Sequence, residues 1–188
     1  MKNPFVFVFL LVVAVFAACK PTDPNVSGTA ILITNAHVVD VATGQIAEDK
    51  ALLIDNGRIV SIGDGSELSA LVGKEDVFDA GGRYVIPGLW DMHVHIEGED
   101  LVEDNRALLP LYVAYGITTV RDCASDLGEL VLAWRDSINN DQLFGPQIFT
   151  AGRKLEGINS IWKGDLEIAN KEELQQMLDK LDAYNVDF

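Results

Sequence analysis

The run PGLWDMHVHI, residues 87–96, decides how the rest of this 188-residue chain is interpreted. A Pro-Gly turn leads into an apolar segment, which predicts a β-strand. Strand residues two apart project to the same side, so Asp91, His93 and His95 are expected to share one face. Imidazole pairs suit zinc and transition metals of similar preference. An isolated His-x-His is more often an apolar strand with two polar interruptions, but Asp91, the turn and the segments that follow favour a metal site.

Strands and helices alternate after this run. Strands are expected at residues 90–96, 117–122 and 147–151, with another beginning at Val186; helices are expected at residues 105–115, at 126–139 and from Asn170 onward. Repeated βα units predict a parallel sheet or barrel, and barrel active sites lie at the carboxyl ends of the strands. The fold class is therefore α/β, and residues 88–188 are assigned to the first three to four βα units of a barrel.

Residues 29–87 are expected to form a small β-domain. The β-rich segments are residues 30–34, 37–41, 51–54, 58–62, 77–79 and 83–86. Asn56-Gly57 lies between two of them, and this dipeptide is a strong hairpin signal because both turn positions need positive φ.

The N-terminus has the order of an export signal. Lys2 precedes a twelve-residue apolar core, too short to span a bilayer, and small residues follow. Residues 1–18 are assigned as a signal peptide. The tetrapeptide FAAC ending at Cys19 resembles a bacterial lipobox, so Cys19 is the expected lipidation site and residues 19–28 a tether. This predicts an exported, membrane-anchored lipoprotein, periplasmic or on the cell surface; the alternative is plain cleavage that leaves Cys19 free.

The net charge excludes one class of function, and the remaining polar residues are weaker candidates for the site. A net charge of -15 with no basic cluster argues against nucleic-acid binding. Arg121 and Asp122 end the second barrel strand and could support a metal site, but a structural pair or a helix cap by Asp122 is an equal alternative. Cys123 is interpreted as an inert thiol and His37 as a surface or core residue. Five acidic residues follow His95 and form an acidic loop: Glu97, Glu99, Asp100, Glu103 and Asp104. This loop is expected to be solvated, although it could receive a cationic group of a substrate.

The run VFDAGGRYVIPGLWDMHVHI, residues 77–96, resembles the passage of the amidohydrolase superfamily from a small β-sandwich into a metal-dependent (β/α)8 barrel. NRALLPLYVAYGITTVRD, residues 105–122, is similar to the imidazolonepropionase-like and prolidase-like members. The resemblance implies that residues 29–87 are part of a β-sandwich. It also implies a site for one or two divalent ions, zinc being expected, in which His93 and His95 bind one ion and Asp91 supports the two histidines. The family's later ligands are absent, so it also implies an N-terminal fragment, which we expect to be neither well folded nor active alone.

Three functions stay open at this level. The first is a hydrolase of carbon-nitrogen bonds in cyclic or N-acyl amides, and the second is a metallo-dipeptidase of the same superfamily. Both act on a small-molecule amide or peptide through metal-activated water. The third is a noncatalytic surface lipoprotein. Neither the substrate nor the oligomeric state follows from the sequence.

The first testable prediction concerns Cys19. If its acyl chains hold the protein on the membrane, Cys19→Ser should move the protein to the soluble fraction or leave the precursor uncleaved. Membrane fractionation and mass spectrometry of the N-terminal peptide measure both outcomes. A soluble wild-type protein with unmodified Cys19 would contradict the prediction.

Overall fold

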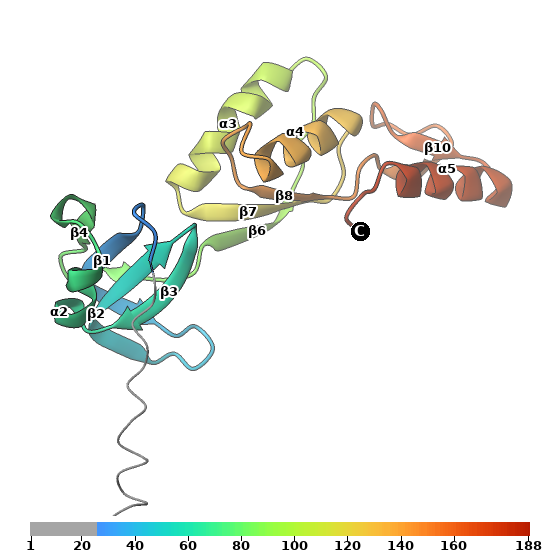
Figure 1. Ribbon diagram of the computed structural model, residues 1–188. Coiled ribbons are helices and arrows are strands. Elements are labelled where there is room, and N and C mark those ends of the chain that lie inside the picture. Colours follow the sequence, from blue (N-terminus) through green and yellow to red (C-terminus); the bar gives the residue numbers. More distant parts are fainter. Residues whose placement is uncertain (1–25) are drawn as a thin grey trace, which may run out of the picture. The chain divides into compact units, whose positions relative to one another are not determined.

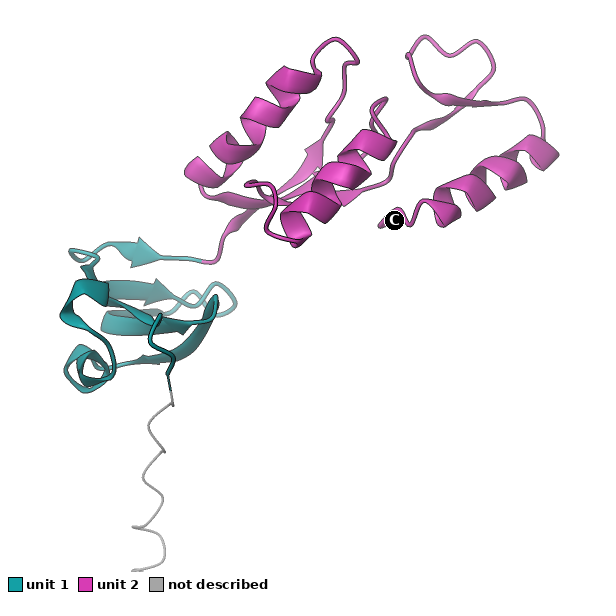
Figure 2. Cartoon of the chain, turned by 45° about the horizontal axis from the view of Figure 1, so that its top comes forward, with its two compact units in different colours: residues 1–86 teal, residues 87–188 magenta. Residues whose placement is uncertain are grey.

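The computed structural model describes residues 26–188, which form two compact units divided between Ile86 and Pro87 (Figures 1 and 2). The expected signal peptide and Cys19 lie outside the described residues, as does most of the expected tether. Across residues 26–188, no helix combines the length and the apolar character needed to cross a bilayer.

The first unit contains one five-stranded sheet. Its strands are β1 (Ile31–Val39), β2 (Ile46–Asp55), β3 (Arg58–Gly63), β4 (Val77–Asp79) and β5 (Tyr84–Val85). The order is β3-β2-β1-β4, with β5 also on β1; β1, β2 and β3 are antiparallel, whereas β4 and β5 run parallel to β1. A short helix, α2 (Gly65–Leu68), covers a core of Ala30, Leu32, Ala51, Leu53 and Leu68. Residues 26–86 hold no second sheet, so the β-sandwich stays a prediction.

The local sequence signals predicted most features of this unit. The Asn56-Gly57 hairpin is confirmed, with φ of +50° and +70° at the two turn positions. The two segments expected at residues 30–34 and 37–41 are one strand, because β1 continues through an irregular register with Asn35 at a φ of +52°. Asn tolerates this left-handed conformation, so the chain bends there without ending the strand.

The second unit is built on three parallel strands, as the βα pattern predicted. These are β6 (Leu89–Val94), β7 (Ile117–Asp122) and β8 (Gln147–Thr150), in that order. Helices α3 (Val102–Ala114) and α4 (Glu129–Asn139) cover the same face of the sheet (Figure 1). The core between them contains Val94, Leu109, Val120, Val131, Trp134 and Ile148. The unit is thus mixed α/β with parallel βα order, and closure into a barrel stays a prediction.

Several boundaries in the second unit differ from the sequence-based ones. Helix α3 starts at Val102 and carries Pro110 in its interior. Helix α4 starts at Glu129 because Asp126 does not cap it; the Asp126 carboxylate accepts a hydrogen bond from the Gly98 backbone instead. A parallel pair, β9 (Leu155–Gly157) and β10 (Leu166–Ile168), was not predicted, since three-residue strands carry little periodicity.

The end of the described chain also departs partly from expectation. Helix α5 (Lys171–Ala183) begins as predicted: the Asn170 side chain accepts from two first-turn amides, and Glu173 accepts from the Ala169 amide. Residues 186–188 were expected to start a strand, but none is formed there. The Asp187 amide nevertheless donates to the Thr150 carbonyl at 2.9 Å, so this segment lies beside β8.

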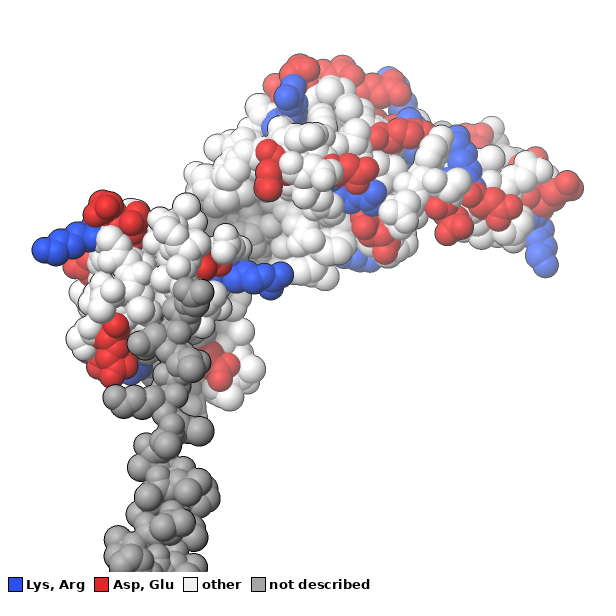
Figure 3. Space-filling model, viewed as in Figure 1, with Lys and Arg blue, Asp and Glu red and all other residues white. Residues whose placement is uncertain are grey.

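Basic side chains are dispersed among acidic ones. On the face shown in Figure 3, Lys and Arg lie singly between Asp and Glu. In the second unit Arg135 pairs with Asp136 and Asp187, Arg153 with Glu129, and Lys154 with Glu156 and Asp165. These pairs neutralise three of the eight basic side chains in residues 87–188.

The hairpin gives the second prediction. In the intact protein, Gly57→Ala should lower the free energy of unfolding of the first unit by about 1 kcal/mol, because alanine is strained at φ +70° even with nothing within 4 Å of its Cβ. Gly63→Ala is the matched control, since the added Cβ would lie 3.7 Å from Leu68 and no positive φ is required. Urea unfolding measures both, and equal losses would contradict the conformational explanation.

Candidate metal centre

His93 and His95 bring their rings together where β6 ends. Their Nε2 atoms are 3.2 Å apart, and the ring planes make an angle of 65°. Two zinc–nitrogen bonds of ~2.0–2.1 Å at a tetrahedral angle place their nitrogens ~3.3 Å apart, so the observed separation fits two ligands of one ion. The same separation also fits an N–H···N hydrogen bond between the rings.

The contact made by the other ring nitrogen of His95 favours metal binding over a hydrogen bond between the two rings. Its Nδ1 lies 3.0 Å from the carbonyl oxygen of Ala124, in the loop that follows β7. If Nδ1 carries the proton and donates it to this carbonyl, Nε2 keeps its lone pair on the side facing His93. Metal-binding histidines almost always have such a partner on the second nitrogen.

The end of β7 fixes the backbone on both sides of His95. The Asp122 carboxylate accepts a hydrogen bond from the Ile96 amide at 3.1 Å, and the Ser125 hydroxyl donates one to the Ile96 carbonyl. On the other side of His95, the Cys123 amide donates to the Val94 carbonyl at 3.0 Å. Asp122 and Ser125 are fully buried or nearly so. The position of His95 is therefore set by contacts from the neighbouring strand and its loop.

Thr150 extends this support to the third strand. Its hydroxyl donates to the second oxygen of Asp122 at 2.6 Å and accepts from the Gly152 amide at 3.0 Å. Burial raises the pKa of the Asp122 carboxyl, while the hydrogen bonds from Thr150 and Ile96 act in the opposite direction. Asp122 and Thr150 are register partners at the ends of β7 and β8, so one buried carboxylate links three strand ends.

Asp91 contacts the backbone. Its Oδ1 accepts a hydrogen bond from the His93 amide at 3.2 Å. The register of β6 against β7 shifts between Asp91 and Val94, so the strict alternation that predicted one face for Asp91, His93 and His95 is interrupted. Irregularities of this kind re-aim side chains near barrel rims. The structure thus brings the two histidines together and places Asp91 where it can hold the irregular backbone.

The remaining sequence candidates have other contacts. The Arg121 guanidinium lies over the Phe188 ring, 4.1 Å from its centroid, and donates to the Cys123 sulfur at 3.4 Å. Cys123 is a free, half-buried thiol. His37 belongs to the first unit, where its ring packs against Tyr84 at 5.2 Å. Sequence reasoning missed Ser125 and Thr150; their one available signal is their position at or just after a strand's carboxyl end.

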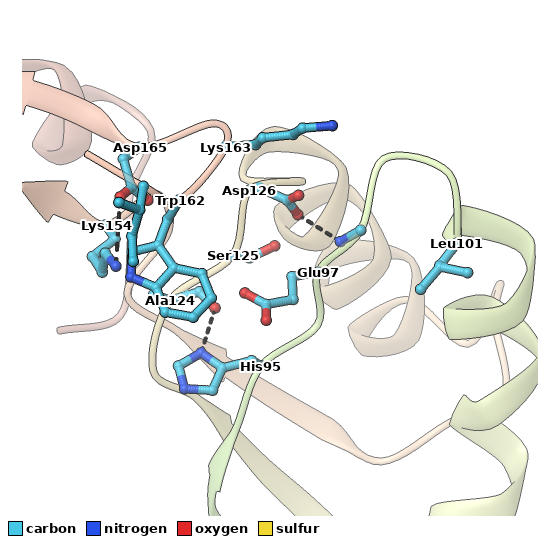
Figure 4. Close-up of a pocket in the computed structure, with 12 residues that line it drawn as sticks. His95, Glu97, Leu101, Ala124, Ser125, Asp126, Lys154, Trp162, Lys163 and Asp165 are labelled. Atoms are coloured by element: carbon cyan, nitrogen blue, oxygen red, sulfur yellow. Dashed lines mark hydrogen bonds and ion pairs between the residues drawn. The ribbon is translucent and has the colours of Figure 1, made fainter. Parts of the chain in front are cut away.

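A cavity of about 530 Å³ opens beside His95 (Figure 4). Glu97 and Asp126 from the loops after β6 and β7 line it, and Lys154 and Trp162 line it from the side of β9 and β10. In Figure 4 the Glu97 carboxylate is directed into this space. Of the acidic loop after His95, Glu97 is therefore the member that can reach a bound molecule close to the histidines.

The donor set fits part of a metal site. Catalytic zinc sites typically have three protein ligands. Within residues 26–188, no group of three or more His, Cys, Asp or Glu side chains has the geometry to hold an ion. His93 and His95 could therefore hold an ion only together with at least one further protein ligand.

Comparisons with known proteins found relatives that match part of the chain. No family model matches the chain. It is 37% identical over 101 residues to an adenine deaminase of Listeria welshimeri, covering 53% of this chain and 16% of the enzyme. It is 38% identical over 96 residues to a dihydroorotase of Trichlorobacter lovleyi, covering 48% of this chain and 21% of that enzyme. The chain thus spans less than a quarter of either relative.

Solved structures show the same fold. A proposed prolidase from Bifidobacterium longum superposes with a TM-score of 0.73 at 21% identity, covering 84% of this chain and 39% of that one. A Xaa-Pro dipeptidase with methionine bound in its active site superposes with a TM-score of 0.61 at 24% identity, covering 84% of this chain and 45% of that one. At these identities the likeness concerns the fold alone.

Thr150 gives the third prediction. Thr150→Val keeps the side-chain shape but removes the hydroxyl that bonds Asp122, so metal binding at the histidine pair in the intact protein should weaken about tenfold or more. Thr150→Ser keeps the hydroxyl and should retain most of the affinity. Competition with a chromophoric chelator measures both. Equal affinities in the two variants would show that the Thr150 hydroxyl does not support the histidines.

Proposed function

The chain belongs to the amidohydrolase superfamily, and from that premise we propose that its protein is a metal-dependent hydrolase of carbon–nitrogen bonds. The observation that carries the proposal is the 3.2 Å approach of the His93 and His95 Nε2 atoms at the end of the first parallel strand. Strand ends of this kind are where barrel enzymes place their chemistry.

The relatives support the reaction class. The names adenine deaminase and dihydroorotase both denote enzymes that hydrolyse carbon–nitrogen bonds, and superfamily members depend on divalent metals. We propose zinc, as one or two ions, because neutral imidazoles are ligands that zinc prefers. For the whole protein we propose a (β/α)8 barrel with a β-sandwich, to which the two units described contribute the first parts. We also propose that the protein is attached to a membrane through acyl chains on Cys19.

Each residue of the centre has a definite task. A bound divalent ion would supply activated water and polarise the bond to be broken. His93 and His95 would hold the ion through Nε2, with the His95 proton on Nδ1 donated to the Ala124 carbonyl. Asp122 and Ser125 fix the backbone beside His95, which keeps its ring in place. Glu97 offers a carboxylate in the cavity that can accept a proton or receive a cationic substrate group.

A metallo-dipeptidase is the second candidate. It is suggested by the proposed prolidase and the Xaa-Pro dipeptidase, whose fold this chain shares. The two candidates differ in substrate, so a panel of N-acyl amino acids, cyclic amides and dipeptides separates them. Absence of hydrolysis across the whole panel by the metal-loaded protein would favour a noncatalytic lipoprotein.

The fourth prediction tests the metal ligands. In the intact protein, His93→Ala or His95→Ala should remove at least one equivalent of bound metal and nearly all hydrolysis, because a shell missing one imidazole cannot hold the ion in place. Elemental analysis and turnover of the panel substrates measure the two effects. His37→Ala is the matched control, since His37 lies in the first unit, and it should leave both unchanged. Full metal content and turnover in either site variant would refute the assignment.

A further inference from the structure

The loop between β9 and β10 exposes large apolar side chains beside the candidate centre. Ile161 is 88% exposed, Trp162 57% and Ile158 62%. Ile161 and Trp162 line the same cavity as His95, and Figure 4 shows the indole standing across this space from Glu97. Ile158 lies on the same loop but does not line that cavity. Exposed apolar groups that border a cavity are typical of a ligand-binding surface.

This loop is held in shape by its own polar contacts. The Ser160 hydroxyl accepts from the Trp162 amide at 3.1 Å and donates to the Asp165 carboxylate, and the Ser160 amide donates to Glu167 at 2.9 Å. These contacts hold the loop backbone at Trp162 before any ligand arrives. Preorganised apolar groups of this kind bind ligands at a lower entropic cost.

The lysine that lies against the indole is already paired. The Lys154 ammonium lies 4.9 Å from the Trp162 ring centroid and 3.4 Å from the Asp165 carboxylate, which is 7% exposed. Lys154 is thereby neutralised and does not offer a free site for an anion. Lys163 lies at the rim far from His95 in Figure 4. The wall formed by Ile161 and Trp162 is thus apolar, and Lys154 beside it is committed to internal contacts.

We propose that Trp162 and Ile161 are specificity-determining residues, which select substrates carrying an apolar aliphatic or aromatic substituent next to the bond that is hydrolysed. The inference rests on the proposed function, because the histidine pair must hold the metal that binds the reacting group. One end of such a substrate lies at His93 and His95, and its apolar substituent covers Ile161 and the indole.

Hydroxamic acids test this without knowledge of the natural substrate, because the hydroxamate binds metal and the substituent faces the cavity. For the zinc-loaded intact protein, calorimetry should show hexanohydroxamate and benzohydroxamate binding at least about tenfold more tightly than acetohydroxamate. Trp162→Ala and Ile161→Ser should abolish most of this gain and leave acetohydroxamate affinity within about twofold. Ile158→Ser, the matched control, should keep the gain. Retained acetohydroxamate binding also shows that each variant is folded at the centre.

The outcomes separate the two proposals. If no hydroxamate binds the zinc-loaded wild-type protein, the metal site fails and the specificity proposal fails with it. If acetohydroxamate binds but the larger compounds gain nothing, the metal site stands and the apolar wall is wrong. A gain that survives both cavity variants, or that Ile158→Ser removes equally, would also overturn the role of Trp162 and Ile161.

Discussion

The buried carboxylate of Asp122 is the contact on which the candidate centre depends. A buried carboxylate is costly unless hydrogen bonds satisfy it. Here the donors are the Ile96 amide, just after β6, and the Thr150 hydroxyl, at the end of β8. Satisfying one buried group therefore fixes three strand ends together, and His95 lies one residue from the bond that Asp122 makes with Ile96. The hydrogen bonds that satisfy Asp122 thus also position His95.

In the parallel sheet of the second unit, register shifts occur between β6 and β7 and not between β7 and β8. The register shift between Asp91 and Val94 falls on the strand that carries both histidines, and the Asp91 carboxylate bonds the His93 amide within it. Strand β7 has no such irregularity against β8. The irregular register of β6 beside the regular pairing of β7 with β8 allows the two imidazoles to converge.

The cavity combines walls of different character despite the strongly acidic chain. Glu97 and Asp126 come from the loops after β6 and β7, whereas the opposite wall consists of an indole and an isoleucine on a loop shaped by Ser160. Pairing of Lys154 with Asp165 removes the charge that would otherwise face this apolar wall. The polar and apolar halves thus suit a small molecule with one reactive polar end.

Local sequence determined those features that depend on near neighbours: the Asn56-Gly57 hairpin and the helix start after Asn170, because turn and capping geometry act over a few residues. The alternation of strands with helices and the spacing of His93 and His95 were also visible in the sequence. The convergence of the two rings depends in addition on the irregular backbone of β6 and on the contacts made by Asp122 and Ala124. Tertiary structure alone decided which distant groups meet. Asp126 has the sequence signature of a helix cap, yet it bonds Gly98 because strand pairing brings that amide to it. Thr150, Ser125 and Trp162 reach the centre for the same reason: their distance from His95 is set by strand order, which no local propensity encodes.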